Sequence, residues 1–284
     1  MMKKKSLLYI VVLIAVGLFS LLTPQEEKVG LSHQAGILQV AFLDVGQGDS
    51  AFMILPEGKT VLIDAGEQDA GTVITDFISS CGISKIDYFI LSHPHSDHIG
   101  GAETVLSQFE IGAVYMPNAV HTSRTFEKLL QTLKQDNLPV HRAEAGVTIE
   151  IDSAVDMTFV SPKAQGYEDL NNASAVLRVT YGEKAFLFAG DAEELAEQDM
   201  IKSGLPLKAH VLKVGHHGSS TSSCTSFLKA VSPEVAIISA GIDNDYGHPH
   251  RETLESLNKL GVNKILRTDE SGTIIISTDG KKIW

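Results

Sequence analysis

The sequence predicts an α/β protein in which two β-sheets pack face to face between outer layers of helices, a four-layer αββα sandwich. Apolar runs of strand length alternate with helix-like stretches through most of the chain, and the order of strands followed by helices occurs twice. Many of these apolar runs are continuous rather than alternating, which is typical of strands covered on both faces. Two mixed sheets with helices on their outer faces would bury all of these segments.

The first 22 residues are expected to form an export segment. Three lysines at positions 3–5 precede an unbroken apolar run over residues 7–22, the order of charged and apolar regions in a signal peptide. At about 1.5 Å per residue the run falls somewhat short of the ~30 Å hydrocarbon layer, so a cleaved signal peptide and an N-terminal membrane anchor both remain open. The absence of a clear cleavage site before Thr23 slightly favours an anchor. The rest of the chain is expected to be secreted or anchored at the outer face of the cell membrane.

Residues 23–36 are polar and rich in turn formers, so we interpret them as a linker to a single folded body over residues 37–284. In the first half of the body, strands are predicted over residues 37–43, 50–56, 60–66, 87–93 and 113–117, and helices over residues 72–82, 100–109 and 122–135. In the second half, strands are predicted over residues 140–143, 147–151, 156–162, 174–191 (a hairpin), 210–215, 234–240, 264–268 and 272–278, and helices over residues 192–204, 225–231 and 251–261.

The composition narrows the class of function. A net charge of −12 opposes a broad electrostatic grip on nucleic acid, although it does not exclude nucleic acid as a substrate. Cys81 and Cys224 are the only cysteines, too few for a zinc–thiolate framework or a disulfide-stapled scaffold, and their spacing does not reveal whether they pair. Any metal must therefore be held by histidine and carboxylate side chains.

The strongest chemical signal is the loop HPHSDH over residues 93–98. It follows an apolar strand and precedes Ile99-Gly100-Gly101, which opens a helix. Imidazoles and a carboxylate at the end of a strand can converge on one point while the scaffold holds them in place. A solvated histidine-rich turn is the alternative interpretation.

Other candidate residues also lie at strand ends: Asp64, Asp191, His216 and His217. Taken alone, each aspartate has an ordinary interpretation as a helix cap or turn residue, and each histidine as a loop residue. Brought together with Asp97, however, the two aspartates would repel one another unless cations neutralise them. The set therefore favours a metal centre.

In combination and order, these motifs resemble a known family. LIDAG, HPHSDHIGG, FAGD and KVGHHGS resemble the motifs of the metallo-β-lactamase superfamily, and FLDVGQGDS, NNASAVL and YGHPH resemble its ComEC-type branch, the hydrolase domain of DNA-uptake competence proteins. The resemblance covers residues 37–284. Competence channels of this type carry many transmembrane segments, whereas this chain has one short apolar run, so it resembles a stand-alone relative.

The resemblance implies a site for two divalent metal ions, zinc in the first place and manganese as the alternative. Asp64 would orient a ligand from outside the site, and His217 remains an alternative to His216. The implied ligands are His93 and His95 for the first metal, Asp97 and His98 for the second, Asp191 as the bridge, and His216 to complete the second site.

The chain departs from the family pattern where many members place another histidine on the first metal. Here the sequence reads Asn171-Asn172-Ala173-Ser174, so Asn172 or a water is expected near that position, with weaker or different metal selection. Asn172, Lys213, Ser219 and Ser220 are possible contacts to a phosphate or ester.

The predicted catalytic residues are Asp97, Asp191 and His248. His248 lies on a Gly/Pro turn before a helix, a suitable place for a proton donor at the rim of a site, although a surface turn histidine is the alternative. Residues 44–50 (DVGQGDS) lack the lysine and the following helix of a phosphate-binding loop. We interpret them as a hairpin whose Gln47 or Asp49 reaches inward, with a purely structural hairpin as the alternative.

The resemblance implies hydrolysis of phosphodiesters, with extracellular DNA as the favoured substrate. Hydrolysis of a small or cell-wall-linked ester, such as a phosphorylcholine ester or a lactone, is the alternative, and the acidic composition favours it. A non-catalytic metal-binding module is the alternative from another class, but carboxylates that repel one another in an empty site argue against it. The sequence indicates no protein partner.

Overall fold

The computed structural model describes residues 30–163 and 167–284, and its compact body spans Leu31–Trp284. The predicted signal or anchor over residues 1–22 lies outside the described residues, as does half of the predicted linker. Of the linker residues that are described, Leu31 is buried in the hydrophobic core. None of the described helices is both long and apolar enough to cross a lipid bilayer.

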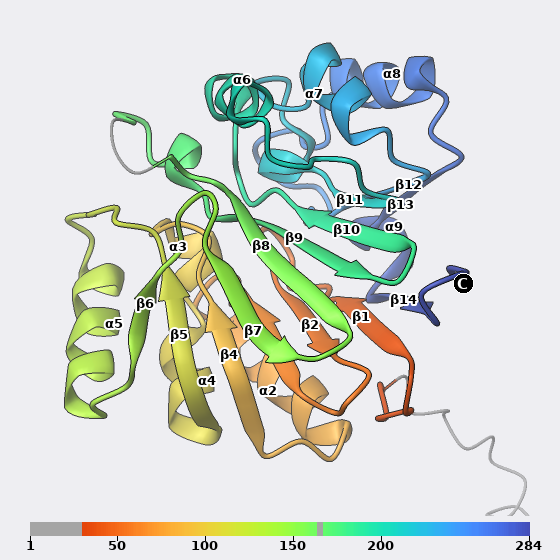
Figure 1. Ribbon diagram of the computed structural model, residues 1–284. Coiled ribbons are helices and arrows are strands. Elements are labelled where there is room, and N and C mark those ends of the chain that lie inside the picture. Colours follow the sequence, from red (N-terminus) through yellow and green to blue (C-terminus); the bar gives the residue numbers. More distant parts are fainter. Residues whose placement is uncertain (1–29, 164–166) are drawn as a thin grey trace, which may run out of the picture. The chain divides into compact units, whose positions relative to one another are not determined.

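The described strands form two seven-stranded sheets (Figure 1). In spatial order, the first sheet contains β14 (Ile274–Thr278), β1 (Leu38–Phe42), β2 (Ala51–Ile54), β3 (Thr60–Ile63), β4 (Lys85–Ile90), β5 (Glu110–Met116) and β6 (Val140–Arg142). The second contains β13 (Lys264–Arg267), β12 (Val235–Ile238), β11 (Val211–Lys213), β10 (Lys184–Phe188), β9 (Val176–Tyr181), β8 (Val155–Ser161) and β7 (Thr148–Asp152).

The helices gather on the outer faces of the two sheets (Figure 1). The first sheet is associated with α2 (Ala70–Ser80), α3 (Ser96–Ile99), α4 (Ala102–Gln108) and α5 (Arg124–Gln135), and the second with α6 (Glu194–Ser203), α7 (Thr225–Val231) and α8 (Arg251–Leu260). Shorter turns of helix are η1 (Asn171–Ala173), η2 (Gly215–Gly218) and α9 (Thr268–Ser271).

Three hydrophobic cores separate the four layers. One core joins the first sheet to its helices and contains Ile74 and Phe89. The second lies between the sheets and contains Phe42 and Phe186, and the third joins the second sheet to its helices and contains Leu212. Because side chains along a strand point alternately to its two faces, a strand between two cores needs apolar residues at nearly every position. The predicted four-layer αββα sandwich is confirmed.

Each sheet contains a parallel half, β3 to β6 in the first and β10 to β13 in the second. The segments that follow β4, β10 and β11 carry the candidate metal ligands and the segment that follows β3 carries Asp64, so these residues all lie at the same edge of the sandwich. The strand predicted over residues 87–93 ends at Ile90, and the chain is irregular from there to His95. This early end frees the first histidines from the alternating geometry of the sheet.

One further difference concerns the strand predicted to end at Thr268, which ends at Arg267. The hydroxyl of Thr268 hydrogen-bonds both the N–H and the carbonyl oxygen of Ala240. These bonds draw Thr268 out of the strand and into the first turn of α9.

We expect Phe186→Ala to lower the free energy of unfolding by about 3–5 kcal/mol, because this ring is fully buried between the sheets and its removal leaves a cavity. Urea unfolding followed by circular dichroism measures the change. Val73→Ala is the control, since Val73 is 49% exposed on α2, and it should alter stability by no more than about 0.5 kcal/mol. Equal effects of the two substitutions would contradict this account of the core.

Candidate metal centre

The loop after β4 changes from an extended to a helical backbone within a few residues. His95 is extended (φ −75°, ψ 152°) and α3 begins at the next residue, which places Asp97 and His98 in the first turn of α3. The glycines that follow let this turn lie directly on the chain after β3, because a Cβ at Gly101 would lie 2.4 Å from the carbonyl oxygen of Ala65. Asp64 and the candidate ligands of α3 are thereby brought together.

Asp64 orients His98. Its backbone is left-handed (φ 57°), and its Oδ1 accepts a 2.7 Å hydrogen bond from the N–H of Ser92. Its Oδ2 accepts a 2.7 Å hydrogen bond from the Ser92 hydroxyl and lies 2.9 Å from Nδ1 of His98. A proton on Nδ1 leaves Nε2 of His98 with a free lone pair, which is the form of imidazole that binds a metal.

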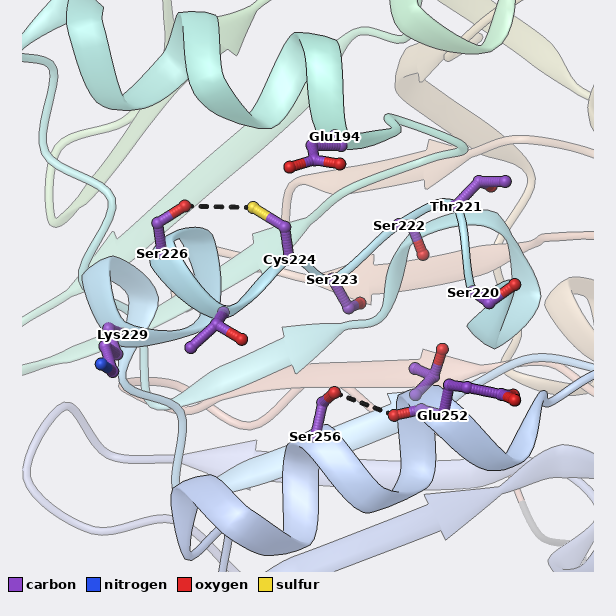
Figure 2. A pocket seen from close by; sticks show the side chains of 12 residues that line it. Glu194, Ser220, Thr221, Ser222, Ser223, Cys224, Ser226, Lys229, Glu252 and Ser256 are labelled. Atoms are coloured by element: carbon purple, nitrogen blue, oxygen red, sulfur yellow. Dashed lines mark hydrogen bonds between the residues drawn. The ribbon is translucent and has the colours of Figure 1, made fainter.

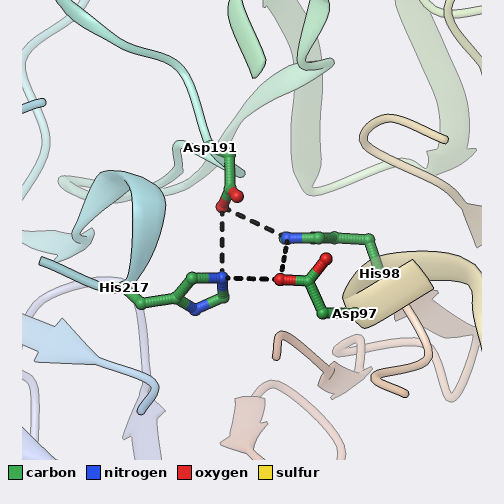
Figure 3. A group of neighbouring side chains, drawn as sticks. All are labelled: Asp97, His98, Asp191 and His217. Atoms are coloured by element: carbon green, nitrogen blue, oxygen red, sulfur yellow. Dashed lines mark hydrogen bonds and ion pairs between the residues drawn. The ribbon is translucent and has the colours of Figure 1, made fainter. Parts of the chain in front are cut away.

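Four side chains from segments that follow strands of both sheets converge in one cluster (Figure 3). They are Asp97, His98, Asp191 and His217, and one ligand atom from each lies within 4.8 Å of all the others. Nε2 of His98 lies 3.2 Å from Oδ1 of Asp191, and Nε2 of His217 lies 3.2 Å from Oδ2 of Asp97 and 3.6 Å from Oδ1 of Asp191. The geometry therefore places His217, rather than His216, beside Asp97 and His98.

A second group of imidazoles faces the other oxygen of Asp191. Nε2 of His93 and Nε2 of His216 each lie 3.8 Å from Oδ2 of Asp191, and Nε2 of His93 lies 3.0 Å from Nδ1 of His95. Nδ1 of His216 lies 3.1 Å from a carboxylate oxygen of Glu193, a residue that the sequence analysis did not single out. Asp191 thus stands between two groups of imidazoles.

The charges of the cluster depend strongly on one another. Burial raises the pKa of Asp191, but the neighbouring His98 and His217 outweigh burial and hold this pKa well below its usual value. Burial lowers the pKa of His98 and of His217, but Asp191 and other carboxylates raise the first well above its usual value and the second to about 10. The cluster therefore requires positive charge among its carboxylates, which protons or a metal ion can supply.

The donor atoms fit a divalent cation. Nε2 of His98 and Oδ1 of Asp191 are buried, and neither has a hydrogen-bond partner among the described residues. Buried polar atoms are normally paired, and these two point toward each other within the cluster of Figure 3. Imidazole and carboxylate without thiolate suit zinc, and the oxygen-rich composition also suits manganese.

Lys213 is committed to an internal ion pair rather than to the contact with substrate that the sequence analysis considered. It is only 4% exposed, and its Nζ lies 2.8 Å from Oδ2 of Asp49. Burial raises the pKa of Asp49, but Lys213 and His217 outweigh burial and lower this pKa to about 2. Nδ1 of His217 lies 3.1 Å from the carbonyl oxygen of Ser239 and 3.3 Å from Oδ1 of Asp49, so Ser239 and Asp49 together hold the ring of His217. Residues 44–50 therefore reach the site through both of the predicted residues, because Asp49 lies beside His217 and Gln47 lines the pocket.

The asparagines before β9 take different positions. Asn172 is buried, accepts a 3.0 Å hydrogen bond from the N–H of Ala196 and donates to Glu193, whereas Asn171 lines the pocket above the cluster. Ser219 is also buried, and its hydroxyl bonds to Thr221. Neither Asn172 nor Ser219 lines that pocket. The sequence does not predict the short 3-10 turn that gives the side chains of Asn171 and Asn172 different surroundings.

The pocket above the cluster has a volume of ≈ 320 Å³. It is lined by Gln47, His95, Ser96, Asp97, His121, Ser123, Asn171, Asp191, His216, His217, Tyr246 and His248. His248 packs against His217, with ring centroids 6.0 Å apart. Burial and the neighbouring His217 and His216 lower the pKa of His248 to about 4, so its ring is neutral at pH 7.

A larger hollow of ≈ 610 Å³ lies elsewhere on the second half of the chain (Figure 2). It is lined mainly by residues 220–226, which carry hydroxyl groups except for Cys224, and Glu194, Lys229 and Glu252 are among its other side chains. No histidine lines this hollow. The smaller pocket, which contains the imidazoles and carboxylates, is the candidate site.

Comparison with known proteins identifies the family. Residues 43–242 match the metallo-β-lactamase superfamily. The chain is 34% identical over 255 residues to ComE operon protein 3 of Bacillus subtilis, covering 83% of this chain and 32% of that protein. It is 34% identical over 239 residues to competence protein ComA of Neisseria gonorrhoeae, covering 83% and 31%. It is 24% identical over 190 residues to endoribonuclease ysh-1 of Neurospora crassa, covering 59% and 22%. The chain therefore spans about a third or less of the length of these relatives.

Solved structures share the fold at low sequence identity. The chain resembles CmlA, a diiron β-hydroxylase from Streptomyces venezuelae, with a TM-score of 0.53 and 14% identity over 81% of this chain and 52% of that one. It also resembles a diphosphatase from the PhnP family, with a TM-score of 0.51 and 16% identity over 85% and 98% of the two chains. These similarities establish the architecture and leave the reaction open.

We expect the purified protein to bind about two divalent ions per chain, and a chelator to lower its melting temperature, because ions that bind only the folded state stabilise it. Elemental analysis and thermal melts with and without chelator measure both quantities. Asp191→Ala is the control, since removal of this carboxylate should abolish metal binding and make the melt indifferent to chelator. A wild-type protein that stays metal-free after reconstitution and melts unchanged would contradict the assignment.

Proposed function

The chain belongs to the metallo-β-lactamase superfamily of hydrolases, and on that basis we propose that it cleaves the phosphodiester bonds of nucleic acid, DNA in particular, with two divalent metal ions. One observation carries this proposal: the two oxygens of Asp191 face two separate groups of imidazoles. The relatives support the choice of substrate, since one is named a competence protein and another an endoribonuclease.

The distances guide the assignment of the metal ligands. We group His217 with Asp97 and His98, because its Nε2 lies 3.2 Å from Oδ2 of Asp97 and within 4.8 Å of the ligand atoms of the group. His216 belongs with His93 and His95, because it shares with His93 the second oxygen of Asp191. In this assignment His216 supplies the imidazole that the sequence lacks at the Asn171-Asn172 position. Zinc is our first choice of metal and manganese the second.

Metal ions bound at these two groups would polarise a phosphoryl oxygen and bring the pKa of a water molecule toward neutrality. The protein's own contribution is to hold the donor atoms in place before substrate arrives. Asp64 fixes the ring of His98, and the Ser239 carbonyl with Asp49 fixes that of His217. Asp97 and Asp191 hold their negative charge close to both imidazoles. Such preorganisation avoids rearrangement during the reaction.

His248 is our candidate proton donor for the leaving oxygen. It lines the pocket directly beside His216 and His217. Its pKa of about 4 keeps the ring neutral at pH 7, so the donor role requires a bound phosphate anion, whose charge raises the pKa of an adjacent imidazole. His248 then loses its proton to the leaving group as the phosphodiester bond breaks.

Hydrolysis of a small or cell-wall-linked ester, a phosphorylcholine ester or a lactone, is the second candidate function. The residues that line the metal pocket include no lysine or arginine, and the whole chain carries a net charge of −12. A surface of this kind attracts a polyanion only weakly. A neutral or zwitterionic ester does not face this electrostatic barrier.

The proposed substrate, extracellular DNA, requires that the body lie outside the cytoplasm, as the lysines and the apolar run of residues 3–22 also indicate. We expect protease added to intact cells to digest an anchored body, or the culture medium to contain a released one. A cytoplasmic marker protein serves as the control for lysis. Complete protection of the body in intact cells, with none in the medium, would rule out export.

We expect His95→Ala and Asp191→Ala to lose both metal and hydrolysis, whereas His248→Ala keeps its metal content and loses roughly 10² to 10⁴ in rate. The loss should be largest on DNA, whose leaving group needs a proton, and smallest on bis-p-nitrophenyl phosphate, whose leaving group does not. Steady-state rates with zinc and with manganese provide the measurement.

Other outcomes of the same assays point elsewhere. Equal loss in His248→Ala on good and poor leaving groups would make His248 a substrate contact rather than an acid. No cleavage of DNA by the metal-loaded protein, together with rapid hydrolysis of phosphorylcholine esters or lactones, would replace the proposed function by the second candidate.

A further inference from the structure

An exposed aromatic side chain lines the metal pocket, and two exposed apolar residues adjoin its lining in the sequence. Tyr246 lines the pocket and is 67% exposed. Val120 is 77% exposed and precedes His121, which also lines it. Ile242 is 73% exposed and follows Gly241. The N–H of Gly241 donates a 3.1 Å hydrogen bond to the side chain of Gln47, which lines the pocket. Single exposed apolar residues are ordinary on a protein surface, but a group at the rim of a pocket marks a place of contact.

The ring of Tyr246 is the outermost member of an aromatic stack that leads to the metal ligands. It lies 5.7 Å from the ring of His248 with an interplanar angle of 19°, and His248 lies 6.0 Å from the ring of His217 at 26°. His217 belongs to the cluster with Asp191. The exposed side of the tyrosine ring is therefore a flat surface that continues the stack outward from the metal centre.

The loop that carries Tyr246 is held firmly from within. The side-chain amide of Asn244 donates to the carbonyl oxygens of His248 (2.7 Å) and Gly241 (2.9 Å) and accepts from the N–H of His248 (2.9 Å). Nε2 of His250 lies 3.1 Å from the carbonyl oxygen of Tyr246. These bonds fix the backbone of the loop before any substrate arrives, so little backbone entropy is lost when the ring is used.

The charge of the pocket determines what the ring can hold. No lysine or arginine lines the pocket, and Asp97 and Asp191 do, so side chains supply little attraction for the phosphates that flank a cleavage site. Aromatic rings hold nucleic acid in another way, by stacking on the flat face of a base. In a duplex each base face is already covered by its neighbours, whereas an unpaired base can leave its stack.

We propose that Tyr246 stacks on a nucleobase next to the scissile phosphate and thereby makes the enzyme select unpaired strands over duplex. The inference rests on the proposed cleavage of nucleic acid and specifies the form of its substrate. Tyr246 acts on binding, not on the chemical step, because its ring reaches the cluster only through His248.

The test compares wild type with Tyr246→Ala and Tyr246→Phe on metal-loaded full-length protein. The substrates are a single-stranded oligonucleotide, the same oligonucleotide with abasic sites around one cleavable phosphate, and its duplex. We expect wild type to prefer the single strand over the duplex. Tyr246→Ala should raise KM for the single strand roughly 5- to 100-fold with little change in kcat, leave KM for the abasic substrate unchanged, and shrink the preference over duplex. Tyr246→Phe should behave as wild type, because stacking needs the ring and not the hydroxyl.

Trp284→Ala is the matched control, since Trp284 is another exposed aromatic residue, 59% exposed, and does not line the pocket. It should change none of these constants. Equal rises in KM for Tyr246→Ala on the base-bearing and abasic strands, or wild-type preference for duplex, would overturn the stacking proposal while leaving nucleic-acid cleavage intact. Failure of wild type to cut any of the three substrates would overturn the proposed function itself, and the stacking proposal with it.

Discussion

The whole arrangement depends on the pairing of buried carboxylates with imidazoles at the edge where the two sheets meet. Asp64 and His98 come from the first sheet and Asp191 and His217 from the second, and each is almost completely buried. A buried carboxylate without a partner is costly, so neither half of the sandwich can present its charged residues alone. The contacts that hold the candidate metal ligands therefore also hold the two sheets together at this edge.

Protons and metals compete for the same atoms in this site. Carboxylates raise the pKa of His98 and His217, which means that both rings bind protons readily when no other cation neutralises their neighbours. Metal binding must release those protons, so affinity for metal decreases as the pH falls. The ion pair between Lys213 and Asp49 lies on the far side of His217 and pairs the buried carboxylate of Asp49 with a cation from the chain itself.

The strand-end signals of the sequence led to most of the site, because a polar residue after a buried strand is easy to recognise and parallel strands end at one edge. The sequence could not predict which of the adjacent residues His216 and His217 lies beside Asp97. Both have left-handed backbones, and these turn the two rings toward different oxygens of Asp191. Lys213 looked like an anion-binding residue because a sequence does not distinguish a buried ion pair from an exposed cation. Glu193 gave no signal, since a carboxylate at the start of a helix is ordinary.

The order of the ligands along the chain has a consequence for synthesis. The first half of the sandwich carries the HPHSDH loop, but Asp191 follows β10 and His217 follows β11, both late in the chain. A nascent chain that has emerged only through β9 holds four of the ligands and lacks the carboxylate that joins the two groups. The complete set of candidate ligands therefore comes together only after most of the chain has left the ribosome, so translation itself delays the assembly of the site until the fold that contains it is nearly finished.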